Sequence, residues 1–191
     1  MNDENVIIER VLSGDAGAFR RFVELHQALV FQFARNMLRS PEDAEELTQD
    51  VFVAAFQNLA TFDATRARVS TWLLTIARNR CLNRLRQRQP ELSADLERSD
   101  PAPCPAETAS QREVWQHLDS ALQRLPLEQR TAFVLAEIQE LPHADVAAIE
   151  GIELGTVKSR VSRARERLRE AMRAWQPEGV APSKPRRQHH E

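Results

Sequence analysis

The side chains best suited to chemistry in this sequence are basic and hydroxyl groups near the C-terminus. They share one side of a helix predicted to begin at Thr156 and lie opposite an apolar stripe, Val157, Val161, Ala164 and Leu168. Lysine and arginine donate hydrogen bonds to guanine edges in the DNA major groove. This face, which the sequence predicts to contact bases, comprises Lys158, Ser159, Ser162 and Arg163. Other arginines lie beside this face or farther along the helix, where DNA phosphates would pass. They are Arg160, Arg165, Arg167 and Arg169.

The segment before this helix is typical of a helix-turn-helix. A short apolar helix ends at Gly151, and Gly155 opens the second helix with Thr156 as the expected N-cap. In that motif the second helix lies in the major groove with its first turns against the bases. The alternative is an arginine-rich solvated helix, in which Glu166 and Glu170 form ion pairs within the helix.

A second basic block precedes the middle of the chain. Residues 61–90 carry seven arginines and one acidic residue, together with Phe62 and Trp72. Arginines interleaved with aromatic rings suit unstacked nucleic acid, whose bases need stacking partners. The preceding helix has an acidic stripe of Asp43, Glu46 and Asp50. The alternatives are a merely solvated acidic face and aromatic rings that belong to the core.

Composition excludes several classes of protein. The net charge of −2 hides basic blocks at 61–90 and 151–176 that alternate with acidic ones. The two cysteines, Cys81 and Cys104, and the five histidines form no ligand or catalytic cluster. No glycine-rich phosphate loop or Ser/His/Asp set is present. We therefore expect no enzyme, no metal and no cofactor. We also expect no membrane span and no secretory signal, and hence a cytoplasmic protein.

The apolar periodicity is helical almost throughout, which predicts an all-α fold. Asp15 is a plausible N-cap, and Ser40 with Pro41 supplies a cap and a first-turn proline. Four prolines mark residues 89–112 as a flexible linker, long enough that the two halves need not touch. The tail is expected to be disordered. The predicted helices cover residues 4–13, 15–38, 41–59, 70–88, 114–125, 127–140, 145–150 and 156–175.

Three motifs together resemble the extracytoplasmic-function (ECF) sigma factors of bacterial RNA polymerase. They are DAEELTQDVF at 43–52, STWLLTIARN at 70–79, and GTVKSR at 155–160 followed by RARERL at 163–168. The resemblance implies two small helical domains joined by a flexible linker, the second containing the helix-turn-helix. It assigns 1–88 to sigma region 2, 89–112 to the linker, 113–176 to sigma region 4 and 177–191 to a disordered tail.

The resemblance also implies partners and site residues. Region 2 would bind the polymerase β′ clamp helices and the −10 element, and region 4 would bind the −35 element and the β flap. An anti-sigma factor would control a chain that is monomeric when free. Polymerase core contacts would be Asp43, Glu46, Gln49, Asp50 and Phe52. Contacts to the −10 element would be Phe62, Trp72, Arg78, Asn79, Arg80, Asn83, Arg84 and Arg86. Contacts to the −35 element would be Lys158, Ser159, Arg160, Ser162, Arg163, Arg165 and Arg167.

The chain departs from the family pattern at two positions. Glu150 stands where leucine usually precedes the turn glycine, and Glu153 stands where proline often follows Gly-Ile. Because of Glu150, the family pattern does not fix the residue at which the short helix before Gly151 ends. Residues 63–69 match the family's variable specificity loop. The resemblance therefore does not imply which −10 sequence this chain prefers. An ordinary helix-turn-helix repressor or activator is the rival hypothesis, with the first half as a dimerisation domain that gives the two-fold symmetry needed for paired half-sites.

Overall fold

The computed structural model describes residues 3–88 and 109–175, and every regular element in these two ranges is helical. The expected all-α fold is thus confirmed. The predicted linker, apart from its last four residues, and the whole of the predicted tail lie outside the described residues. Helix formation begins at Ala109, inside the range that the sequence assigned to the linker.

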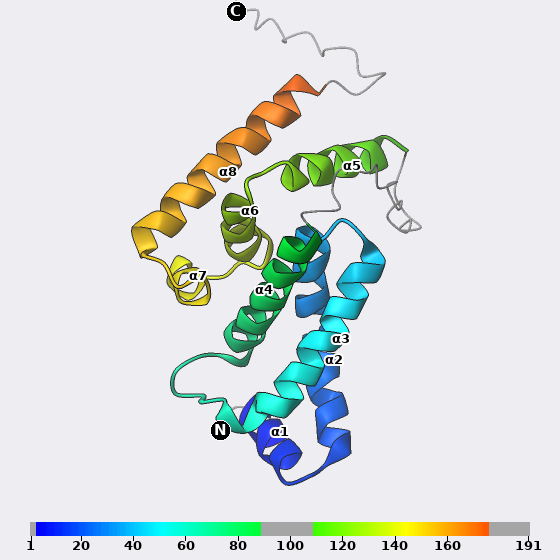
Figure 1. Cartoon of the computed structure of the whole chain (residues 1–191), viewed down its shortest axis with the longest axis vertical. Coiled ribbons are helices and arrows are strands. Elements are labelled where there is room, and N and C mark those ends of the chain that lie inside the picture. The colour runs from blue at the N-terminus through cyan, green and yellow to red at the C-terminus, as the bar shows by residue number, and fades with distance from the viewer. Residues whose placement is uncertain (1–2, 89–108, 176–191) are drawn as a thin grey trace, which may run out of the picture.

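The N-terminal domain is a bundle in which α4 packs against both α2 and α3 (Figure 1). Two of its helices begin at the predicted caps. The Asp15 carboxylate accepts a hydrogen bond from the Ala18 amide at 3.0 Å, and the Ser40 hydroxyl accepts one from the Asp43 amide at 3.1 Å. The elements are α1 (Asp3–Leu12), α2 (Ala16–Met37), α3 (Pro41–Asn58), the 3₁₀ turn η1 (Leu59–Thr61) and α4 (Val69–Arg88).

The core of this domain follows the predicted apolar stripes. In α3, Leu47, Val51, Ala55 and Leu59 are all buried, as their spacing of four residues requires. They meet large buried side chains of the neighbouring helices, such as Phe33 of α2 and Leu73 of α4, in one continuous cluster. This packing leaves the acidic edge of α3 directed toward α4.

The C-terminal domain is a set of shorter helices beneath the long α8 (Figure 1). The predicted single helix over 127–140 is interrupted, because its second half is a π-helical turn rather than α-helix. The elements are α5 (Ala109–Gln123), α6 (Leu127–Phe133), η2 (Val134–Ile138), α7 (His143–Glu150) and α8 (Leu154–Ala174).

The turn between α7 and α8 has the predicted glycine but a different cap. Gly151 ends α7 with φ of 66°, a left-handed conformation that favours glycine. This confirms that the helix ends at Glu150. The prediction of Thr156 as N-cap was wrong, because α8 begins at Leu154 and Glu153 occupies the cap position. The Thr156 amide already donates to the Glu153 carbonyl at 2.9 Å, which places Thr156 inside the first turn.

The two domains are in direct contact, which the length of the linker did not require. Helix α7 packs against α4. Both α5 and η2 pack against α2 of the first domain. The Gln123 side-chain amide donates to the Asn36 carbonyl at 3.2 Å across this boundary. The basic helix α4 is therefore the element of the first domain that faces the helix-turn-helix.

Candidate nucleic-acid interface

The exposed face of α8 matches the prediction for a DNA-reading helix. Val157, Val161, Ala164 and Leu168 are buried in a single stripe, which directs the other side chains outward. Lys158, Ser162 and Arg163 are exposed near the N-terminal end, and Arg165 and Arg167 are exposed farther along. The face therefore presents long cationic donors to any duplex laid along it.

Two of the residues predicted to contact the −35 element are engaged within the chain. The half-buried Ser159 donates its hydroxyl to the Thr156 carbonyl at 2.9 Å. The Arg160 guanidinium is held between two carboxylates, donating to Glu150 at 2.8 Å and to Glu128 at 2.7 Å. These two side chains are less available to bases than their places in the sequence indicated.

Arg165 also has a partner, but its own side chain is more exposed than that of Arg160. Its guanidinium donates to the Glu137 carboxylate at 2.7 Å, and about half of the Arg165 side chain, 48%, is open to solvent. Exposed ion pairs contribute little free energy, about 0–1 kcal/mol. A phosphate could therefore replace Glu137 at small cost.

In the first domain, Phe62 and Trp72 contact each other. Their ring centroids lie 5.3 Å apart with an interplanar angle of 52°, and both rings are half-buried against the core. The pair ties the loop after α3 to the first turn of α4. The aromatic rings thus have a packing role, and both side chains remain partly exposed.

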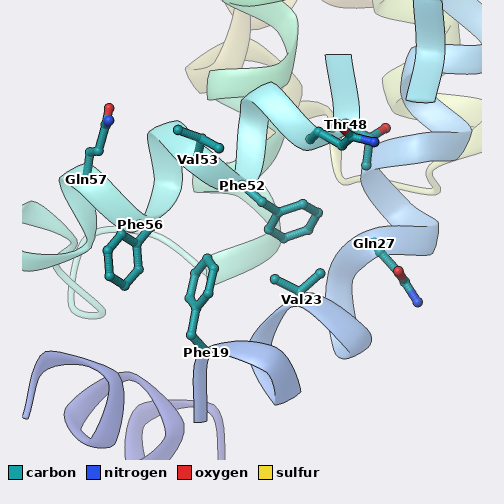
Figure 2. A pocket seen from close by; sticks show the side chains of 9 residues that line it. Phe19, Val23, Gln27, Thr48, Phe52, Val53, Phe56 and Gln57 are labelled. Carbon is teal, nitrogen blue, oxygen red and sulfur yellow. The ribbon is translucent and has the colours of Figure 1, made fainter. Parts of the chain in front are cut away.

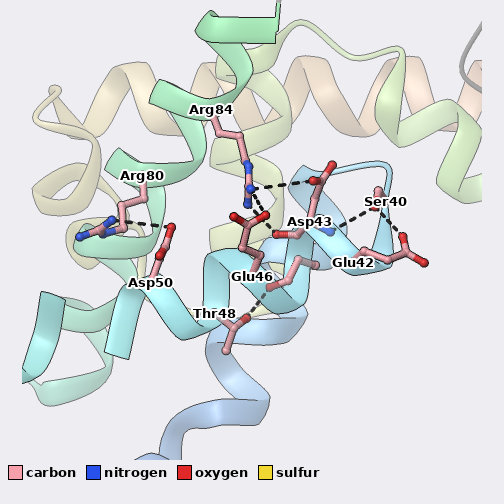
Figure 3. A network of polar contacts seen from close by, with 9 residues as sticks. Ser40, Glu42, Asp43, Glu46, Thr48, Asp50, Arg80 and Arg84 are labelled. Atoms are coloured by element: carbon pink, nitrogen blue, oxygen red, sulfur yellow. Dashed lines mark hydrogen bonds and ion pairs between the residues drawn. The ribbon is translucent and has the colours of Figure 1, made fainter. Parts of the chain in front are cut away.

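The arginines of α4 are paired with the acidic edge of α3 (Figure 3). Arg84 donates to the Asp43 backbone carbonyl at 3.0 Å and to the Glu46 carboxylate. Arg80 lies 3.8 Å from the exposed carboxylate of Asp50. Three of the five residues predicted to contact polymerase therefore also hold α4 in place.

The remaining polar residues of α4 differ in exposure. Asn79, Asn83 and Arg86 are exposed. Arg78 is partly buried, with 24% of its side chain exposed, and its Nε lies 3.4 Å from Glu150 of α7. The structure therefore divides the predicted −10 residues into an exposed group and a group engaged in contacts within the chain.

The other two residues predicted to contact polymerase lie beside an apolar groove between α2 and α3 (Figure 2). The groove has a volume of about 420 Å³. Gln49 borders it, whereas the Phe52 side chain is buried in its floor. Val53 and Phe56 are each 56% exposed, unusual for large apolar side chains on one helix. Sequence reasoning missed both, although each is an apolar residue that falls outside the buried stripe of α3.

Glu150 is a further residue whose position sequence reasoning did not foresee. Its side chain is only 2% exposed, and its two oxygens face Arg78 and Arg160. Burial raises the pKa of its carboxyl, and the two guanidinium groups oppose that shift. The available signal was the place of Glu150 four residues after the buried Val146, on the same side of the helix.

Other kinds of site find no support among residues 3–88 and 109–175. Burial raises the pKa of the Cys81 thiol to about 12, which leaves it protonated and unreactive. No group of three potential metal ligands occurs in the described parts of the chain. No helix there is long and apolar enough to cross a membrane.

Comparison with known families identifies both domains. Residues 22–91 match the family Sigma-70 region 2, and residues 115–168 match Sigma-70, region 4. The ECF RNA polymerase sigma factor SigW of Bacillus subtilis is 31% identical over 178 residues, covering 87% of this chain and 95% of that protein. The ECF sigma factor SigM of Mycobacterium tuberculosis is 38% identical, covering 82% of this chain and 78% of that protein.

Solved structures show the same fold. The sigma factor RpoE of Bartonella quintana, in complex with the anti-sigma factor NepR, matches with a TM-score of 0.71 and 30% identity, covering 83% of this chain and 98% of that one. CnrH, in complex with the cytosolic domain of CnrY, also gives a TM-score of 0.71, with 24% identity over 92% of this chain. The second likeness supports the fold alone.

The contacts of Arg84 predict that it stabilises the first domain. Replacing Arg84 by alanine should lower the free energy of unfolding by about 2 kcal/mol, because the partly buried Asp43 carbonyl and the Glu46 carboxylate lose their donor. Urea denaturation followed by circular dichroism measures the change. Arg86→Ala is the matched control, because Arg86 is exposed on the same helix; its effect should stay within about 0.5 kcal/mol. Equal effects of the two substitutions would contradict this role for Arg84.

Proposed function

This chain belongs to the extracytoplasmic-function sigma factors of the sigma-70 family, and from that premise we propose how its surfaces divide the work of promoter recognition. It is a sigma factor, which binds core RNA polymerase and directs transcription initiation. The observation that carries the assignment is the presence of both sigma-70 regions, in order, on two helical domains. The chemistry of polymerisation belongs to the polymerase.

Helix α8 is the proposed reader of the −35 element. Lys158, Ser162 and Arg163 are exposed where a helix-turn-helix presents its second helix to the major groove. Arg165 and Arg167 lie farther along and are suited to phosphates. Arg160 joins them only if it leaves Glu150 and Glu128, and Ser159 only if its hydroxyl turns from the backbone.

The −10 element is proposed to lie along α4 and the loop before it. Asn79, Asn83 and Arg86 are exposed and can approach a displaced strand directly. Arg80 is 40% exposed and paired at 3.8 Å with an exposed carboxylate, so a phosphate can compete for it. Arg84, whose contacts fix α4 to α3, is proposed to position the helix rather than to bind bases.

The proposed dock for the β′ clamp helices is the surface of α3. Its exposed acidic residues, Glu46 and Asp50, lie on the same helix as Gln49, Val53 and Phe56, which are exposed in the groove. An apolar centre with a charged rim is typical of a protein interface. Contact with the β flap is assigned to the second domain.

Control by an anti-sigma factor is proposed from the relatives. The Bartonella quintana sigma factor with a TM-score of 0.71 was solved with its anti-sigma factor bound. Such an inhibitor would have to cover the basic faces, the α3 dock, or both. We place the activity in the cytoplasm, with the polymerase, and expect the free chain to be a monomer.

Transcription in vitro tests the assignment as a whole. With core polymerase, a promoter library and this chain as the only added factor, we expect transcripts from one class of promoter sharing a −35 and a −10 sequence. Core polymerase alone supplies the background. A transcript set unchanged by the added chain would reject the function.

The role of Arg163 predicts a loss of specificity at the −35 element. Arg163→Ala should weaken binding by about 1–3 kcal/mol and relax the preferred base at the position it contacts. Binding-site selection with randomised duplexes measures both effects. Arg173→Ala is the control, because Arg173 is exposed in the last turn of the same helix, far from the reading end. An unchanged base preference in the Arg163 variant would count against its assignment.

The dock on α3 predicts sensitivity to charge reversal. Asp50→Lys should weaken binding to core polymerase, because the acidic rim becomes basic, while −35 duplex binding stays at the wild-type level. Pull-down with core polymerase and duplex titration measure the two properties. Glu9→Lys makes the same change of charge on an exposed residue of α1 and should leave both intact. If the two variants held polymerase equally well, the acidic edge would not be the dock.

A further inference from the structure

One buried carboxylate joins the two domains. Glu150 lies in the last turn of α7, and its side chain is 2% exposed. One oxygen lies 3.4 Å from Nε of Arg78 on α4, and the other accepts a hydrogen bond from Nη1 of Arg160 on α8 at 2.8 Å. Glu150 therefore binds one arginine from each domain at the same time.

These two arginines cannot occupy their promoter sites in this arrangement. The point rests on the proposed function, in which Arg78 serves the −10 element and Arg160 the −35 element. The two elements are about 25 base pairs apart, which is about 85 Å at 3.4 Å per base pair. Side chains that share one carboxylate lie within a few ångströms of each other. Promoter binding therefore requires the domains to separate.

We propose that Glu150 is an interdomain latch that holds the free sigma factor closed, with Arg78 withheld from DNA. Engagement of polymerase and promoter must break the contact between α4 and α7. When it breaks, Arg78 is released for the −10 strand. Arg160 lies in the same domain as Glu150, so its pairs with Glu150 and with the exposed Glu128 do not depend on the contact to α4.

Other residues at the domain boundary also connect the two domains, and their contacts can break. Gln123 bridges the domains by donating to the Asn36 carbonyl while accepting from the Arg130 guanidinium. The contact is imperfect, however, because Nε of Arg78 and Nε of Arg130 are buried without a hydrogen-bond partner. Buried donors without partners carry a desolvation cost that opening relieves. The closed state is therefore held specifically but weakly.

Small-angle X-ray scattering of the full chain, without DNA or polymerase, tests the latch. A compact chain of 191 residues has a radius of gyration of about 16 Å. Glu150→Gln should increase the radius over that of the wild type by a few ångströms, because Arg78 loses its counter-ion and gains by moving into water. Glu128→Gln is the matched control. It removes the other partner of Arg160 with the same change of charge, leaves the contact to α4 intact, and should keep the wild-type radius.

Binding of a single-stranded −10 oligonucleotide, taken from the promoters selected in transcription, provides a second readout. The free Glu150→Gln chain should bind it several-fold more tightly than the wild type. The reason is that only molecules in the open state bind the strand, so a larger open fraction raises the apparent affinity. Glu128→Gln should bind as the wild type does. Unchanged affinity of the Glu150→Gln chain would count against the latch, just as an unchanged radius would.

Other outcomes also decide the question. A folded Glu150→Gln chain with the wild-type radius would overturn the latch. If circular dichroism showed that this variant is unfolded, Arg78→Gln would be measured instead: expansion would support the latch, and a wild-type radius would reject it. Scattering requires no DNA, so it is independent of the proposed function. Failure of promoter-specific transcription would reject that function without deciding whether the latch exists.

Discussion

Neutralisation of the arginines on α4 is the constraint that organises this molecule. The guanidinium groups on α4 would repel one another unless carboxylates or phosphates lay nearby. In the free chain, α3 and α7 provide the carboxylates: Glu46 for Arg84, Asp50 for Arg80 and Glu150 for Arg78. If the proposed −10 site is correct, these acidic groups and the DNA backbone would compete for the same arginine side chains.

The burial of each ion pair determines how easily a phosphate could replace its carboxylate. Asp50 and Arg80 are both well exposed, and their pair contributes little free energy. The side chains of Arg84 and Asp43 are only 18% and 11% exposed, so this pair is much less accessible to a competing phosphate. A single basic helix can thus hold its own position with some arginines and offer others to a ligand. The contact at Glu150 lies between these limits, because it is buried but crosses a domain boundary.

The same division applies to α3. One side of this helix is buried, the second carries the acidic edge against α4, and the third borders the apolar groove with exposed Val53 and Phe56. Apolar groups left open in a small domain carry a cost in water that a partner would remove. At the proposed dock, the groove and the acidic edge of the same helix would give a polymerase subunit both an apolar centre and a charged rim.

Local rules were sufficient for much of this protein. The helical period predicted the buried stripe from Val157 to Leu168, and cap chemistry predicted the helix starts at Asp15 and Ser40, because both depend on residues a few positions apart. The motifs also indicated the family and the all-α fold. They did not predict that Arg78 and Arg160 meet at Glu150, nor that Val53 and Phe56 border a groove. Those features depend on how helices distant in sequence pack, and no periodicity along one helix records which neighbour will cover it.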